Sequence, residues 1–451
     1  MVRIPRCIAL AFLLGAAACS PRGPVAPFPD PSPQPQPEPQ PSGAALVRIG
    51  VVQAADSVAI GGSGSFVVSE CATGRILGPG SNGAAVVTSA GSGSSAGYRV
   101  RIGGSSIESV GPVCVASTTS PAVTINGQPY MGTAEVRRNS AGSLAGINAV
   151  LIEQYLYGVV PRELGPNVFP EVEAQKVQAI AARTYTVAYL GRRAADGYDL
   201  RATVDDQVYG GVAAHHPVST AAVDATRGLV ARRDGKLILA RYSSTSGGHT
   251  GDNEESFAEN PVAYMRGVPD MPPTAGPTFV ASLEAFKTAP YITDFRKPPT
   301  PFDPDRPRYH RWVVEWTPQE LSSMISTFAK RNVGLVRELK VLQRGPSGRI
   351  ISLEFVTDSG SFPASMGVIR QALKYVNPAG AFVNLPSTLF FVEPVIQGGA
   401  PVPGSFRVYG GGFGHGTGMA QVGAVLMARA GKEFPEILAH YYTGVELIRA
   451  Y

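Results

Sequence analysis

The sequence contains little charge and no concentration of positive charge. Of its 451 residues 16% are charged, the formal net charge is +5, and the lysines and arginines are scattered along the chain. Proteins that bind nucleic acids usually gather basic residues into runs or onto one face. We therefore expect no nucleic-acid partner.

Patterns that bind transition metals or organic cofactors are also scarce. The histidines include no pair at H-x-x-x-H or H-x-H spacing, and the cysteines fit no zinc motif. A glycine-rich loop at residues 410–418 contains neither the dinucleotide-binding G-x-G-x-x-G pattern nor a P-loop. We therefore expect neither a metal nor another cofactor.

Long apolar runs are missing except at the N-terminus. There MVRIPRCIALAFLLGAAACS has two arginines, an apolar core too short to span a bilayer, and small residues before Cys19, which is typical of a secretory signal peptide. The end of this segment resembles the lipobox of bacterial lipoproteins, in which the cysteine carries the lipid. An ordinary signal peptide cut after Ala18 is the alternative. We predict a signal peptide at 1–18, a lipid on Cys19, and an exported lipoprotein of the cell envelope held to a membrane by that lipid.

Proline is concentrated directly after this cysteine. In PRGPVAPFPDPSPQPQPEPQPSG nearly every second residue is proline, which favours extended polyproline II and prevents a packed core. We interpret residues 19–43 as a lipid-anchored linker that holds the following domains away from the membrane. A spacer of no particular structure predicts nearly the same properties.

Few cysteines remain for the mature domains. Cys7 leaves with the signal peptide and Cys19 carries the lipid, so Cys71 and Cys114 are left. In an exported protein two remaining cysteines form a disulfide more often than a reactive pair. We predict a disulfide between them.

The rest of the chain divides into four parts by its patterns. Residues 44–145 contain short β-type runs between Gly/Ser clusters, and residues 146–268 contain the strongest helical pattern. Residues 269–395 begin with an irregular proline-rich excursion and continue as an α+β arm, and residues 396–451 combine the glycine loop with two short helices. Strands and helices segregate instead of alternating, so we expect an α+β fold with a β-rich N-terminal module.

Two segments flank a lone carboxylate, Glu163. The run INAVLIEQYLYGVV at 147–160 is interpreted as a further strand, and it leads into Pro161 and Glu163. Residues 171–190 are predicted to form a helix, because small residues recur there at three- and four-residue spacing. The carboxylate could be a helix-start charge or a general acid at the edge of a cleft.

Two histidines lie in loops of small residues. His249 belongs to SSTSGGHTG, and His415 has glycine on both sides in FGHGTG. Glycine lets a backbone approach a ligand closely, although a tight strand-to-helix turn needs glycine as well. With a third ligand the two histidines could hold zinc.

Several motifs, in order from about residue 147 to 449, resemble the SpoIID/LytB family of stage II sporulation protein D and amidase-enhancer relatives. They are YLYGVVPREL, EAQKVQAIAARTYTVAYL, DDQVYGG, AAVDATRGLV, YSSTSGGHTG, YMRGV, FGHGTGMAQVGA and MARAGKEFPEILAHYY. Members of this family act on peptidoglycan, and sporulation protein D is a lytic transglycosylase that prefers glycan strands stripped of stem peptides. The resemblance therefore implies a SpoIID-type catalytic region and peptidoglycan glycan strands as the partner.

The resemblance also implies roles for individual residues. The catalytic glutamate of the family lies in a VPxE motif, which here ends at Glu163, and the lysine of the following helix matches Lys176. The other motifs supply further candidates, and the residues taken as substrate-binding are Lys176, Arg183, Gln207, Tyr209, His249 and His415. Some members hold a metal with a cysteine and a histidine just before QVY. This chain has Asp205 and Asp206 there, which argues against a metal.

One carboxylate is sufficient for lytic transglycosylation, because the C6 hydroxyl of the sugar attacks the anomeric carbon. The glutamate must begin protonated, which requires apolar surroundings that raise its pKa, and Val159, Val160, Leu164 and Val168 could supply them. Two functions stay open. The first is a lytic transglycosylase that cleaves MurNAc–GlcNAc linkages to 1,6-anhydro-MurNAc products, and the second is a non-catalytic wall protein that binds glycan or activates an amidase.

Overall fold

The structure is a computed structural model that describes residues 45–91, 97–270, 282–288, 310–377, 379–396, 398 and 403–451. The predicted signal peptide, Cys19 and the proline-rich linker lie outside these residues. Within the described residues, no helix has the length and apolar character needed to cross a lipid bilayer.

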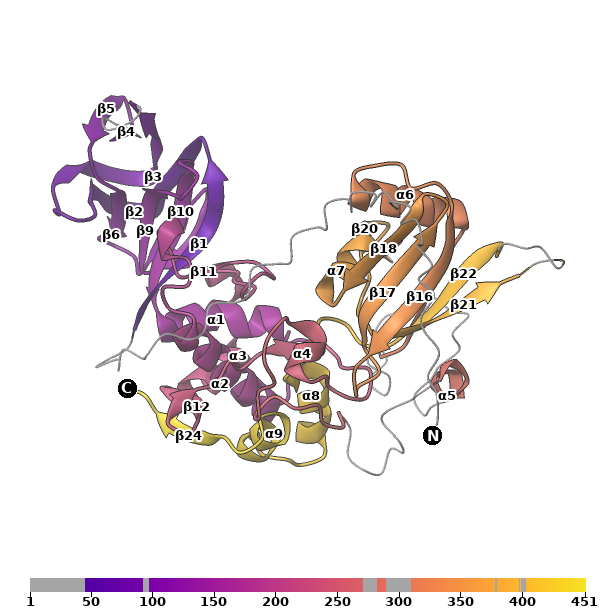
Figure 1. Cartoon of the computed structure of the whole chain (residues 1–451). Helices are drawn as coiled ribbons and strands as arrows, with labels where there is room; N and C mark the ends of the chain where they lie inside the picture. The colour runs from indigo at the N-terminus through magenta and orange to yellow at the C-terminus, as the bar shows by residue number, and fades with distance from the viewer. Residues whose placement is uncertain are drawn as a thin grey trace, which may run out of the picture. The chain divides into compact units, whose positions relative to one another are not determined.

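An eleven-stranded sheet forms the N-terminal part of the described chain (Figure 1). Its main path is β11-β1-β10-β9-β6-β2-β3-β4-β5, and β7 pairs with β2 and β8. The strands are β1 (Leu46–Ala55), β2 (Ser57–Glu70), β3 (Ile76–Ala90), β4 (Gly97–Ile102), β5 (Ser105–Ser109), β6 (Val113–Ser117), β7 (Ala122–Ile125), β8 (Gln128–Met131), β9 (Thr133–Arg138), β10 (Leu144–Leu151) and β11 (Leu200–Arg201). The expected β-rich module is confirmed.

Alternation along the strands supplies the core of this sheet. In β2 the side chains of Val58, Ile60, Phe66 and Val68 are buried, as the two-residue period of a strand requires. The end of β2 is joined to β6 by a disulfide, in which the Cα atoms of Cys71 and Cys114 lie 5.0 Å apart.

The sheet continues into the helical region without a break. The boundary expected between residues 145 and 146 falls inside β10, which pairs with β1 on one side and β9 on the other. Residues of β1 and β10 share a hydrophobic cluster with the helix that follows β10. The position of this helix is therefore fixed by the sheet.

Helix α1 (Ile152–Glu163) corrects the sequence interpretation of residues 147–160 as one strand. The strand β10 ends at Leu151, and the chain then turns into the helix. The fully buried side chains of α1 recur at helical spacing: Ile152, Tyr155, Leu156, Val159 and Val160. An apolar run of this length does not distinguish a buried helix from a buried strand, and the proline in its last turn disguised the helix further.

The helix expected at 171–190 is confirmed as α2 (Val172–Ala188). It contacts α1, α3 (Pro217–Ala225), α8 (Gln421–Arg429) and α9 (Phe434–Tyr441) (Figure 1). Ala179 and Ala182 belong to the cluster of α1, while Ala181 belongs to the cluster of α8 and α9. Small side chains on several faces allow α2 to contact all four helices.

Short strands complete this region. The dipeptide Asp234-Gly235 between two β-type runs predicts a hairpin, and the structure has it as β12 (Leu229–Arg233) and β13 (Lys236–Leu237). Asp234 and Gly235 have φ angles of 51° and 73°, as a type I′ turn requires. β12 also pairs with β24 (Glu446–Arg449). β14 (Tyr242–Ser243) pairs in parallel with β23 (Met419–Ala420), which joins the loop of His249 to that of His415.

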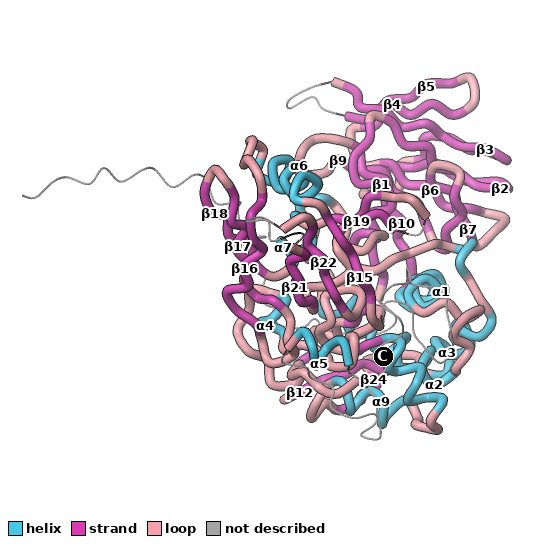
Figure 2. Tube along the Cα trace, turned by 90° about the vertical axis from the view of Figure 1, so that its right-hand side faces the viewer, coloured by secondary structure: helices cyan, strands magenta, loops and turns pink. Residues whose placement is uncertain are grey.

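Residues 310–410 form an α+β arm with its own hydrophobic cluster (Figure 2). Its elements are β15 (Trp312–Trp316), α6 (Pro318–Ala329), β16 (Val336–Arg344), β17 (Ile350–Thr357), β18 (Gly360–Ser365), α7 (Gly367–Ala372), β19 (Lys374–Val376), β20 (Phe382–Asn384), β21 (Phe390–Val395) and β22 (Ser405–Gly410). Two short helices precede it, α4 (Asn253–Ser256) and α5 (Leu283–Thr288), the second inside the stretch expected to be irregular. The α+β class is confirmed.

Candidate active site

Glu163 is the last residue of α1, and its side chain is partly buried. The backbone N–H of Val208 donates a hydrogen bond to Glu163 Oε1 at 2.7 Å. The side-chain amide of Gln421 approaches Glu163 Oε2 at 3.4 Å. Val208 lies in the loop after β11 and Gln421 begins α8, so three distant segments meet at this carboxyl group.

The surroundings of Glu163 favour its protonated form. Burial raises the pKa of the Glu163 carboxyl, and the hydrogen bonds from Val208 and Gln421 oppose this only in part. Val160 and Leu164 are buried beside it, whereas Val168, which we expected to shield it, is exposed. Neither hydrogen-bond partner is charged, so the group is suited to hold a proton and to release it.

An ion-pair cluster around Asp206 holds the loop that carries Val208. The Asp206 side chain is 0% exposed and pairs with Arg192 and Arg193 at 2.9 Å each. It also accepts a hydrogen bond from the backbone N–H of Arg201 at 2.8 Å. Asp206 thus forms ion pairs at the position where, by the family resemblance, some members carry a metal ligand.

This cluster makes a prediction about stability. We expect Asp206→Asn to lower the free energy of unfolding by roughly 3 kcal/mol, because it leaves two arginine cations without their buried partner. Asp205→Asn is the matched control, since Asp205 is 52% exposed and its one ion pair among the described residues is with Arg201. This change should cost at most about 0.5 kcal/mol. A strong chelator should leave the melting temperature unchanged. A drop that zinc reverses would contradict this prediction and make His249 and His415 candidate ligands.

Gln207 and Tyr209 fix the same loop from inside. Gln207 is fully buried. Its side-chain Oε1 accepts a hydrogen bond from the Thr186 hydroxyl at 2.8 Å, and its Nε2 donates one to the Tyr242 hydroxyl at 2.9 Å. The Tyr209 hydroxyl donates to Asn148, and its ring packs where a side chain on Gly158 of α1 would collide with it. Both residues hold the loop in place and are not accessible to a ligand, which corrects their assignment as substrate-binding residues.

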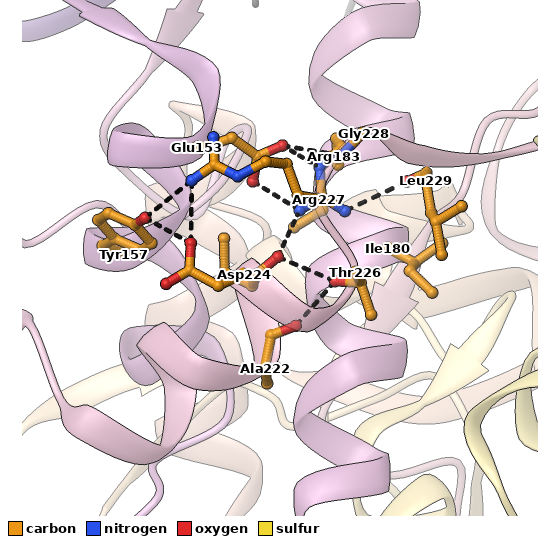
Figure 3. Close-up of polar contacts among 12 residues, drawn as sticks. Glu153, Tyr157, Ile180, Arg183, Ala222, Asp224, Thr226, Arg227, Gly228 and Leu229 are labelled. Atoms are coloured by element: carbon orange, nitrogen blue, oxygen red, sulfur yellow. Dashed lines mark hydrogen bonds and ion pairs between the residues drawn. The ribbon is translucent and has the colours of Figure 1, made fainter. Parts of the chain in front are cut away.

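Arg183 is likewise internal. Its side chain is 0% exposed and pairs with Glu153, with Nη2–Oε2 and Nε–Oε1 distances of 2.7 and 2.9 Å (Figure 3). It also donates to the carbonyl oxygen atoms of Val223 and Leu229. The guanidinium therefore ties α2 to α1 and to the start of β12, and the expectation that it binds substrate is wrong.

Lys176 points toward α9. Its ammonium pairs with Glu173 at 2.7 Å and lies 5.5 Å from the centre of the Phe434 ring. The side chain is 23% exposed, so a ligand could reach it, although the pairing is with Glu173 and not with Glu163. Its role in binding substrate stays a prediction.

The two loop histidines lie on neighbouring loops, since Gly251 bridges Thr417. Burial, with nearby Arg241, Arg370 and Arg349, lowers the pKa of His415 to about 3. Its Nδ1 accepts from the backbone N–H of Thr417, so His415 is a neutral residue that stabilises the glycine loop.

His249 differs, because its Nδ1 lies 2.7 Å from the Thr250 carbonyl oxygen and must donate to it. Its role toward substrate also stays a prediction. Among the described residues, the only group of three possible metal ligands is Cys71, Cys114 and Glu135, and its two cysteines form the disulfide.

The residues that contact Glu163 could not be predicted from the sequence. Gln421 lies in the quoted motif FGHGTGMAQVGA but carries no local signal, and Val208 contributes only a backbone N–H. Tyr155 and Tyr242 were also missed. Burial is the main cause that raises the pKa of each phenol, and the nearby Glu163 charge adds to it.

A separate cavity of about 760 Å³ lies in the arm. It is lined by residues of β15, α6, α7, β19 and β20, including Trp316, Tyr375 and Phe382. None of the residues proposed for the site at Glu163 lines it. The arm cavity is therefore distinct from the candidate active site.

Two family descriptions match separate parts of this chain. Residues 140–232 match the family described as stage II sporulation protein, and residues 252–418 match a domain of unknown function, DUF8618. The first match contains Glu163, Val208 and the Asp206 cluster. The second covers the arm and the glycine loop, and it begins at Asp252, directly after the loop of His249.

Curated relatives cover most of the chain. The amidase enhancer of Bacillus subtilis (strain 168) is 28% identical over 350 residues, 73% of this chain and 45% of that protein. Stage II sporulation protein D of Bacillus amyloliquefaciens is 26% identical over 322 residues, 67% of this chain and 76% of that protein. An uncharacterized protein of Brachyspira hyodysenteriae is 28% identical over 337 residues, 73% of this chain and 75% of that protein. The chain thus spans less than half the length of the amidase enhancer, and it belongs to the SpoIID/LytB family.

Proposed function

We propose that the protein is a peptidoglycan lytic transglycosylase that cleaves the linkage between MurNAc and GlcNAc. The observation that carries this proposal is the carboxyl group of Glu163. It is partly buried, its pKa is raised by burial, and both of its hydrogen-bond partners are uncharged. It also occupies the position of the family's catalytic glutamate.

In the proposed reaction one carboxyl group serves twice. Glu163 first gives its proton to the glycosidic oxygen as the bond from that oxygen to the MurNAc C1 breaks. The C6 hydroxyl of the same MurNAc then bonds to C1, and its proton returns to Glu163. The product carries a 1,6-anhydro ring, no water is consumed, and the glutamate is protonated again.

A hydrolase would need a second carboxylate to activate water. Asp206 is the first carboxylate to consider for that role. Its side chain is enclosed between Arg192 and Arg193 and is 0% exposed. This position supports lytic cleavage over hydrolysis.

The second candidate function is non-catalytic. One relative is named an amidase enhancer, which favours a wall protein that binds glycan or activates a wall amidase. An intact Glu163 in surroundings that raise its pKa favours the enzyme. A wall amidase is therefore proposed as a partner only in the second case.

Incubation of the purified protein with two substrates separates these functions. One substrate is intact cell wall and the other is glycan stripped of stem peptides by an amidase. We expect new 1,6-anhydro-MurNAc ends by mass spectrometry, with faster release from stripped glycan. If neither substrate is cut while an added amidase is accelerated, the non-catalytic function is correct.

We also propose that the protein is an exported lipoprotein anchored through Cys19. Cys19→Ser removes the thiol that would carry the lipid, so the protein should leave the membrane fraction or keep its signal peptide. Membrane fractionation and intact mass measure this. An unchanged mass and unchanged membrane association would contradict the anchor.

A further inference from the structure

Gln421 and Gln178 form a buried pair of amides beside Glu163. Gln421 Nε2 lies 3.4 Å from Glu163 Oε2 and 3.2 Å from Gln178 Oε1. Gln178 on α2 is 0% exposed and Gln421 is 6% exposed. A single amide nitrogen therefore faces two oxygen acceptors, one of them the carboxyl group proposed to carry the reacting proton.

The hydrogen bonds of this arrangement suit the ionised form of Glu163, whereas burial favours its protonated form. Oε1 already accepts from the backbone N–H of Val208, so a proton on the carboxyl group belongs on Oε2. There it would face Gln421 Nε2, which is a donor and cannot accept it. The protonated form needs an acceptor at the position of this nitrogen.

The same arrangement leaves a donor unused. Gln178 Nε2 is buried and has no hydrogen-bond partner among the residues that the structure describes. A buried donor without a partner is unfavourable, because it has lost its hydrogen bond to water. Rotation of a side-chain amide by 180° exchanges its nitrogen and oxygen with little change of shape.

We propose that Gln178 and Gln421 rotate together when Glu163 takes up its proton. Gln421 Oε1 then accepts from the carboxylic O–H of Glu163, and Gln178 Nε2 donates to the same Gln421 oxygen. When Glu163 gives its proton away, both amides return to the orientation seen in the structure. The pair thus supports both protonation states of one acid/base, and this role rests on the proposed function.

Among the groups around Glu163, this pair of amides is the one proposed to change its hydrogen bonds when Glu163 gains or loses a proton. The titratable side chains that face it are Tyr155 of α1 and Tyr242 of β14, and burial keeps both phenols neutral. The loop after β11 contributes the Val208 backbone N–H, which can only donate. Side-chain amides from α2 and α8 can offer either a donor or an acceptor.

Nuclear magnetic resonance of the substrate-free protein tests the pair directly. We expect the Gln178 side-chain NH2 signals to shift with pH at the same midpoint as the Glu163 carboxyl carbon, although no hydrogen bond joins Gln178 to Glu163 in the part of the chain that the structure describes. This shift should vanish in Glu163→Gln and in Gln421→Met. Gln175 is an internal control, because its amide donates to Leu164 and Phe169 carbonyl oxygen atoms and should not respond.

Constant Gln178 signals across the titration of Glu163 would overturn the proposal. The titration uses no substrate, so its result stands whether or not the protein cleaves glycan. In a protein that cleaves glycan, Gln178→Met should lower kcat about tenfold and change KM by less than about twofold, as loss of one hydrogen bond from the transition state predicts. A folded Gln178→Met protein with unchanged kcat would also contradict the proposal.

Discussion

Glu163→Gln is expected to lower the rate of glycan cleavage by about 10²–10⁴-fold or more, because general acid–base assistance is typically worth that much. Glutamine keeps the shape and can accept the Val208 hydrogen bond, but it has no proton to give to the glycosidic oxygen. With no second carboxylate assigned, the loss should lie at the upper end. Initial rates on peptide-stripped glycan measure it.

Two controls separate chemistry from folding in this experiment. Burial raises the Glu163 pKa, so the folded state binds the proton more tightly, and ionisation above that pKa costs stability. Glu163→Gln should therefore melt no lower than the wild type at neutral and alkaline pH. Glu171→Gln removes a carboxylate that pairs with Arg429 at 2.7 Å, and should retain activity within about twofold. A folded Glu163→Gln with full activity would remove Glu163 from the mechanism.

Glu153→Gln is expected to cause the largest loss of stability, about 3–5 kcal/mol, because it leaves the Arg183 charge buried without its partner. Glu153 also accepts from the backbone N–H of Gly228 at 3.1 Å and from the Tyr451 hydroxyl. Urea unfolding measures the change. Glu108→Gln is the matched control, since Glu108 is 71% exposed in its pair with Arg99, and should change stability by at most about 1 kcal/mol.

The same pair predicts how stability depends on pH. Burial by itself would raise the pKa of Glu153, but its hydrogen bonds with Arg183 lower it below the ordinary value of 4.5. A lowered carboxyl pKa contributes stability that is present above the unfolded pKa and is lost as pH falls through the folded pKa. Wild-type stability should therefore fall below pH 4.5 more steeply than that of Glu153→Gln. Parallel curves would contradict a stabilising buried pair.

Local patterns in the sequence predicted the elements that depend on local chemistry. The small-residue spacing predicted α2, and Asp234-Gly235 predicted the β12–β13 hairpin, because these signals are contained within a few residues. Helix α1 was missed, because an apolar run of this length does not distinguish a buried helix from a buried strand and Pro161 stands in its last turn.

The candidate site was predictable only in part. Family motifs identified Glu163, but its partner Gln421 is 258 residues away in the sequence, and only the packing of α8 against α2 brings them together. For Arg183 the sequence led to a role that the structure does not support. A charged residue in a family motif suggests a ligand, whereas its partner Glu153 is an internal carboxylate 30 residues earlier that the sequence does not distinguish from a surface one.

Cleavage of peptide-stripped glycan in isotopically labelled water tests the central claim most directly. If the C6 hydroxyl of the sugar is the nucleophile and Glu163 takes up its proton, the new ends are 1,6-anhydro-MurNAc. They are lighter than the hydrolysis product by one water molecule and contain no labelled oxygen. Reducing ends that carry the label would show that water is the nucleophile, and would contradict a lytic mechanism that uses Glu163 alone.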